Sequence, residues 1–321
     1  MQSKYSRSQP IESKLAWFRC RDEGMSVSKV CQLFGMSRKT YYKWRKRYEE
    51  EGLEGLSERS RRPKRLARLT PEPLAARVIR ARRRKGYGPL LLAWYLRKHG
   101  GVALSPNGVY GVLKRAGLIK RRRKPGRPAR AAPVREPGEV VQMDLKEPPR
   151  AAQGLRSVKY YQFTAIDKAT GLKFARLYDD RSVTSSVDFL SRAQKFFPFP
   201  IRCVQTDNGT EFTYWFMRSV RKEHPFGAAL RAANIDHRLI PVGCPQANGL
   251  VERTHRTDEE EFYNLNRSFK DFHQQRAAFK RYLRRFNLER PNVAHEFKTP
   301  LHRAKEMLNV KRLRLDFELS L

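Results

Sequence analysis

The front of the chain repeats apolar positions with the period of short helices. The stretch 11–52 divides into three helical pieces at Gly24 and Gly35, and Ser26 and Ser37 stand where N-caps are expected. Two short helices joined by a glycine turn, the second strongly basic, are typical of a helix-turn-helix domain. We therefore predict such a domain in residues 1–56.

The third of these helices has two contrasting faces. Tyr41, Trp44 and Tyr48 recur at helical spacing and are expected to pack inward. The opposite face would enter a DNA groove, and it carries Arg38, Lys39, Tyr42, Lys43 and Lys46. An amphipathic helix with a solvated basic face is the alternative interpretation.

A second helical block spans 70–118. Its helix starts are expected at Thr70-Pro71 and Ser105-Pro106, because a capping residue followed by proline favours the first turn. The last helix turns one apolar stripe inward, formed by Val109, Val112, Leu113 and Ala116. The pattern predicts a second helix-turn-helix domain of the winged type, although any small three-helix bundle would give a similar one.

Two basic, proline-broken linkers, 57–69 and 119–137, flank this block. The second contains "PGRP", which is similar to hooks that lie in the minor groove of DNA. A solvated tether is the alternative. The arginines of this linker that we expect to contact DNA are Arg121, Arg122, Arg123 and Arg127.

After residue 137 the apolar pattern changes to that of strands. Strands are expected within 139–146, 159–167, 172–179, 201–209 and 236–243, and helices within 184–197 and 247–265. This order predicts an α/β sheet covered by helices in 138–265. A helical C-terminal extension is expected in 266–321.

The net charge of the chain indicates the kind of partner that it binds. The net charge is +36, and residues 1–137 hold 36 Lys and Arg against only 10 Asp and Glu. Such an excess implies a polyanion, of which nucleic acid is the leading candidate and an anionic membrane the rival. No apolar run is long enough to span a membrane, and the first residues lack the apolar core of a signal peptide. The four scattered cysteines predict reduced thiols.

Three stretches of the second half carry a family resemblance. A strand with Asp144, then "TDNGTEF" (206–212), then "PQANGLVERTHRT" (245–257) resembles the catalytic core of retroviral integrases and of DDE transposases from bacterial insertion sequences. The tail "NLERPNVAHEFKTPLHR" (287–303) is similar to that family's ending. The resemblance implies a ribonuclease H-like core, a bacterial cytoplasmic location with the nucleoid, and no membrane partner.

The resemblance also implies a catalytic and metal-binding triad of Asp144, Asp207 and Glu252. Physical chemistry agrees, since a cup of carboxylates cannot be buried unless cations neutralise it. Two Mg²⁺ ions, with Mn²⁺ as a substitute, would serve an in-line phosphoryl displacement. Two alternatives remain: Asp207 as a plain turn aspartate, and a glutamate of 259–261 as third ligand.

The implied function is that of a DNA transposase. It would bind the terminal inverted repeats of an insertion sequence, cleave the 3′ ends and join them to target DNA. Pairing of two ends implies a homodimer or a higher oligomer. The alternatives are a non-catalytic, sequence-specific repressor derived from a transposase, and a ribonuclease acting on RNA–DNA hybrids.

Overall fold

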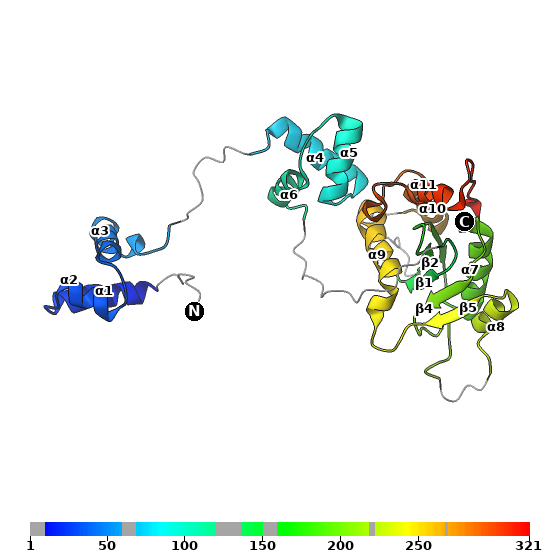
Figure 1. Cartoon of the computed structure of the whole chain (residues 1–321), viewed down its shortest axis with the longest axis horizontal. Helices are drawn as coiled ribbons and strands as arrows, with labels where there is room; N and C mark the ends of the chain where they lie inside the picture. The colour runs from blue at the N-terminus through cyan, green and yellow to red at the C-terminus, as the bar shows by residue number, and fades with distance from the viewer. Residues whose placement is uncertain (1–9, 60–68, 120–135, 150–158, 218–221, 267–268) are drawn as a thin grey trace. The chain divides into compact units, whose positions relative to one another are not determined.

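The computed structural model forms two compact units, Met1–Leu69 and Thr70–Leu321 (Figure 1). The residues that it describes are 10–59, 69–119, 136–149, 159–217, 222–266 and 269–321. None of the helices in these ranges combines the length and the apolar character that crossing a bilayer requires.

The first unit is a three-helix domain, with α1 (Ile11–Asp22), α2 (Val27–Leu33) and α3 (Arg38–Gly55). The two predicted N-caps are confirmed: the Ser26 hydroxyl accepts from the backbone of Lys29, and the Ser37 hydroxyl accepts from that of Thr40. Gly52, at φ +62°, breaks the helical geometry where the sequence predicts an end. One more turn follows before α3 stops.

An aromatic core holds this first unit together. Tyr41 and Trp44 are buried, and Tyr48 stacks on Phe18 with ring centroids 5.3 Å apart, as their spacing predicts. Lys14 is buried as well. Its ammonium donates to the Leu56 carbonyl at 2.8 Å and lies 3.5 Å from the centre of the Trp44 ring. Burial lowers the pKa of Lys14, and these two contacts compensate part of the lost hydration.

The second unit begins with three further helices, α4 (Glu72–Lys85), α5 (Pro89–Gly100) and α6 (Pro106–Arg115). Ser105 caps α6 as predicted, and Val109, Val112 and Leu113 are buried. Ala116 is exposed, because α6 ends one residue earlier. Residues 69–119 contain no strand, so the expected wing is absent from this part of the chain.

A mixed five-stranded sheet follows, in the order β3-β2-β1-β4-β5. Its strands are β1 (Val141–Lys146), β2 (Tyr161–Asp167), β3 (Lys173–Tyr178), β4 (Cys203–Thr206) and β5 (Asp236–Leu239). The first three strands pair antiparallel, whereas β4 pairs parallel with both β1 and β5. This order of strands and helices confirms the prediction.

Helices cover both faces of the sheet (Figure 1). They are α7 (Val183–Phe196), α8 (Pro225–Ala232), α9 (Gly249–Asp258), α10 (Phe272–Leu288) and α11 (Pro300–Leu308). Alternate residues of β3 separate the layers: Phe174 packs with α7, whereas Ala175 and Leu177 pack with α10. The predicted helical C-terminal extension is therefore present as α10 and α11.

A buried ion pair fixes the far end of α9 to the sheet. The Lys173 ammonium binds the Asp258 carboxylate, and both side chains are fully buried. Tyr282 and Gln162 donate to the same carboxylate at 2.6 and 2.7 Å. The chain continues from Asp258 into a π-helical turn, Glu259–Tyr263. Long-range polar contacts thus hold α9 in place.

Candidate active site

The register of two parallel strands sets Asp144 beside Asp207. Val141 of β1 lies opposite Val204 of β4, and Gln142 lies opposite Gln205. Continued by two residues, this register makes Asp144 level with Asp207. Asp207 directly follows β4 and turns the chain, since its carboxylate accepts from the Gly209 backbone at 3.1 Å.

The third predicted residue, Glu252, lies in the first turn of α9 and is exposed. It joins Asp144 and Asp207 in lining one pocket of about 300 Å³. The structure therefore brings all three predicted carboxylates to one place, from three separate elements. A negative side chain in the first turn of a helix is also favoured by the helix dipole.

Two buried glutamines attach the start of α9 to the sheet. The Gln142 side-chain oxygen accepts from the backbone N–H groups of Leu250 and Val251 at 3.2 and 3.1 Å. The side-chain amides of Gln142 and Gln205 both donate to the Ala247 carbonyl at 2.8 Å. We call this arrangement the glutamine clamp. It gives partners to backbone groups at the start of α9 that have none within the helix. It thereby fixes the position of the first turn of α9, which carries Glu252.

Sequence reasoning missed the clamp, although a signal was present. Each glutamine stands two residues before its aspartate, in "VQMD" (141–144) and in "VQTD" (204–207). Residues i and i+2 of a strand share a face, so each clamp residue points the same way as the neighbouring carboxylate. A polar side chain inside a buried strand requires a partner, and here that partner is the helix start.

We expect Gln142→Leu to lower the rate of any reaction at the carboxylate pocket by about 10- to 100-fold, as loss of a positioning hydrogen bond does in metal sites. Gln142→Glu keeps an acceptor for the two N–H groups of α9 and should lose less. Rates of DNA strand cleavage measure the difference, with DNA affinity as the control. Equal losses in both variants would contradict a clamp that acts on the helix start.

The pocket concentrates negative charge. Of the residues that the structure describes, no lysine, arginine or histidine lines it. Burial, followed by the charge of Asp207, raises the pKa of Asp144 to about 7, and the charge of Glu252 adds to this effect. The Leu145 N–H, 2.9 Å from the Asp144 carboxylate, offsets only part of it. The described lining therefore contributes acidic side chains without a matching cationic one.

His255 approaches this site from α9, one turn after Glu252. Its Nδ1 atom lies 3.5 Å from the carboxylate of Asp144. Burial lowers the pKa of His255 to about 4, so the ring is neutral near pH 7 and supplies no positive charge. Sequence reasoning did not select His255, although its i+3 spacing from Glu252 places both on one side of the helix.

The glutamates proposed as rival ligands face elsewhere. Glu259 binds the Lys146 ammonium at 2.6 Å, and the buried Glu261 pairs with Arg290 at 2.8 Å. Glu260 lies 3.9 Å from Arg82 of α4. None of the three lines the carboxylate pocket.

A magnesium ion fits the chemistry of the pocket. Carboxylate oxygens are its preferred ligands, and a divalent cation relieves both the burial of charge and the repulsion from Asp207 that raise the pKa of Asp144. Within the described ranges, no three His, Cys, Asp or Glu side chains converge closely enough to enclose an ion. Mg²⁺ keeps several waters and binds through one or two carboxylates plus substrate phosphate, so such convergence is not required.

The predicted DNA-contacting face of α3 is open to solvent. All five of its residues are exposed: Arg38, Lys39, Tyr42, Lys43 and Lys46. Tyr42 and Lys43 flank the buried rings, with the Tyr42 ring centroid 5.5 Å from that of Tyr41 and the Lys43 ammonium 5.0 Å from the centre of the Trp44 ring. The linker arginines Arg121, Arg122, Arg123 and Arg127 lie outside the described residues.

Comparison with protein families gives four matches. A helix-turn-helix domain matches residues 13–64, and a homeodomain-like domain matches 40–113. Two models, each described as an integrase core domain, match 134–245 and 233–300.

Two relatives come from a virus and a bacterium. The "Putative integrase ORF3" of Spiroplasma virus SpV1-C74 is 29% identical over 160 residues, which are 45% of this chain. The chain spans only 41% of the length of that relative. The uncharacterized protein YlbG of Shigella boydii is 33% identical over 103 residues, 32% of this chain and 83% of YlbG.

Solved structures of retroviral proteins are similar at low identity. An integrase intasome of simian T-cell lymphotropic virus, solved with a PP2A regulatory subunit, aligns at 17% identity and a TM-score of 0.43, over 71% of this chain and 77% of the other. The HTLV-2 integrase catalytic core domain in complex with magnesium aligns at 17% identity and a TM-score of 0.40. The alignment covers 52% of this chain and 96% of the other. Together, the family matches and the sheet confirm the predicted fold class: helix-turn-helix domains precede an α/β, ribonuclease H-like integrase core domain, and a helical C-terminal extension follows.

Proposed function

We propose that this protein is a DNA transposase of the insertion-sequence type. It binds the terminal inverted repeats, cleaves their 3′ ends and joins them to target DNA. The observation that carries the proposal is that Asp144, Asp207 and Glu252 line one pocket, with no cationic side chain among its described lining residues, on an integrase core. The helix-turn-helix domains before the core supply the DNA-binding surface.

The three carboxylates of the pocket would act together as metal ligands. Asp144 and Asp207, fixed by the strand register, and Glu252, fixed by the glutamine clamp, would hold two divalent metal ions. Bound ions would neutralise the scissile phosphate and favour in-line attack by a water or a 3′-OH. Hydrolysis and joining are the same displacement with different nucleophiles, so one rigid set of carboxylates serves both steps.

Labelled repeat DNA tests the proposal directly. The repeats are taken from the DNA that flanks the gene, and the full-length protein is incubated with the labelled duplex and MgCl₂. We expect a cut at the 3′ end of the repeat and larger joined products, both abolished by EDTA. Binding without cleavage in Mg²⁺ and in Mn²⁺ would favour the repressor. Preferential cleavage of an RNA–DNA hybrid would favour the ribonuclease.

The exposed face of α3 supplies a second test. Arg38→Ala and Lys43→Ala are each expected to weaken binding to the repeats, and a base-contacting residue should also lose about 1–3 kcal/mol of discrimination between sequences. Titrations against repeat and scrambled duplexes measure both effects. Glu12→Ala, on α1, is the control for surface substitutions. If both α3 variants bind like wild type, another face of the domain reads the DNA.

A further inference from the structure

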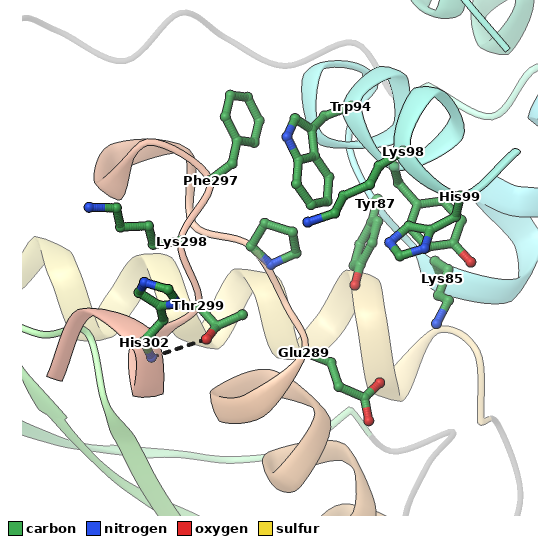
Figure 2. Close-up of a pocket in the computed structure, with 12 residues that line it drawn as sticks. Lys85, Tyr87, Trp94, Lys98, His99, Glu289, Phe297, Lys298, Thr299 and His302 are labelled. Carbon is green, nitrogen blue, oxygen red and sulfur yellow. Dashed lines mark hydrogen bonds between the residues drawn. The ribbon is translucent and has the colours of Figure 1, made fainter. Parts of the chain in front are cut away.

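A second pocket, of about 510 Å³, lies between α5 and the segment that joins α10 to α11. Both sides belong to the compact unit Thr70–Leu321. Figure 2 shows its labelled side chains, with Trp94 and Lys98 on one side and Phe297 and Lys298 on the other. The lining combines aromatic rings with ammonium groups, unlike the acidic pocket described above.

The aromatic part of this pocket is a stacked pair. The Trp94 and Phe297 rings are parallel within 1°, with centroids 5.4 Å apart. Phe297 has a backbone φ of +62°, and Glu296 before it has +53°. Left-handed backbone at two successive non-glycine residues costs about 1–3 kcal/mol at each and persists only where surrounding structure enforces it. Here the Phe297 N–H donates to the Asn292 backbone carbonyl at 2.9 Å, which supports this backbone turn.

The cationic part of the pocket has two lysines without carboxylate partners. Lys98 lies 4.9 Å from the centre of the Trp94 ring, and Lys85 lies 5.4 Å from that of Tyr95. Neither forms an ion pair with any residue in the described ranges, whereas Lys298 pairs with Glu306 at 2.8 Å. Two ammonium groups beside aromatic rings are therefore available to an anionic ligand.

A ligand with both a flat ring and a phosphate matches this lining. Bases within a duplex are stacked and paired, so their faces cannot reach aromatic side chains, whereas an unpaired base can stack on them. We propose that this pocket binds one unpaired nucleotide of a DNA strand, with its base against Trp94 and Phe297 and its phosphate at the Lys98 ammonium.

This inference rests on the proposed function for the source of the nucleotide. Hydrolysis near a 3′ end removes nucleotides from one strand and leaves those of the other strand unpaired. The pocket would then hold the strand that is not joined, while the carboxylate pocket acts on the strand that is.

The test uses binding alone, so that it does not depend on catalysis. Full-length protein carrying Asp207→Asn is titrated with a blunt 30-base-pair duplex and with the same duplex bearing a three-nucleotide 5′ overhang. We expect the overhang to tighten binding by at least about fivefold, the lower end for one stacked base. Trp94→Ala and Lys98→Ala should each remove most of this difference, whereas Lys98→Arg should keep it.

The experiment has a matched control and three contrary outcomes. Lys305→Ala, on α11 and outside this pocket, should change both affinities alike and leave their ratio as it was. Equal affinity of the parent protein for the two probes would overturn the inference alone. So would an overhang preference that survives both Trp94→Ala and Lys98→Ala. Absence of binding to either probe would overturn the proposed function together with it.

Discussion

Replacing Asp207 with asparagine is expected to abolish strand cleavage and joining while leaving binding to the element ends almost unchanged. The amide preserves the shape of the side chain but removes the charge that would hold a metal ion at the end of β4. We expect cleavage to fall by more than about 100-fold, since losing even one preorganised group that stabilises developing charge has that effect. Both quantities are measured on the same labelled repeat duplex.

Asp179→Asn provides the matched control. Asp179 also follows a strand of the sheet directly, but it is exposed and does not line the carboxylate pocket. The same chemical change there should leave cleavage within about twofold of wild type, as expected for a surface substitution worth less than ~0.5 kcal/mol. Substantial residual cleavage by Asp207→Asn in Mg²⁺ would remove Asp207 from the site.

Replacing Lys173 with methionine is expected to destabilise the second unit by about 3–5 kcal/mol, because it leaves the buried Asp258 carboxylate without its ionic partner. The donors from Tyr282 and Gln162 remain, but neither carries a positive charge. Urea unfolding of the full-length protein, followed through the transition of this unit, measures the loss.

A double variant separates the ion pair from general packing. Lys173→Met combined with Asp258→Asn buries no charge at either position, so it should be less destabilised than the sum of the two single variants. Lys159→Met is the control, because Lys159 pairs with Glu147 on the surface and such pairs contribute about 0–1 kcal/mol. Additive losses in the double variant would show that the two charges do not stabilise one another.

Much of this architecture could be predicted because its signals are local. Ser26, Ser37 and Ser105 cap helices through their own neighbours, and buried strands show as short apolar runs. Asp144, Asp207 and Glu252 were implied by the family resemblance, which rests on short motifs such as "TDNGTEF" and "PQANGLVERTHRT". In each case the informative residues lie within a few positions of one another.

The parts that escaped prediction depend on residues far apart in the chain. Lys173 and Asp258 are 85 positions apart, and Gln142 meets the start of α9 more than 100 positions later. A single sequence shows that such polar residues fall in buried elements, but not which partner each one finds. The expected wing failed for a different reason: helical pattern alone does not distinguish a winged domain from a three-helix bundle.

The shared face of the glutamine clamp and the two aspartates restricts how this core can change length during evolution. Side chains alternate between the faces of a strand, so inserting or deleting one residue within 142–144 or 205–207 would separate clamp from carboxylate and turn one of them into the apolar layer beneath α7. The 62 residues between Asp144 and Asp207 carry no such restriction at their connecting turns. Insertions are therefore tolerated between the two "VQxD" segments but not within either one.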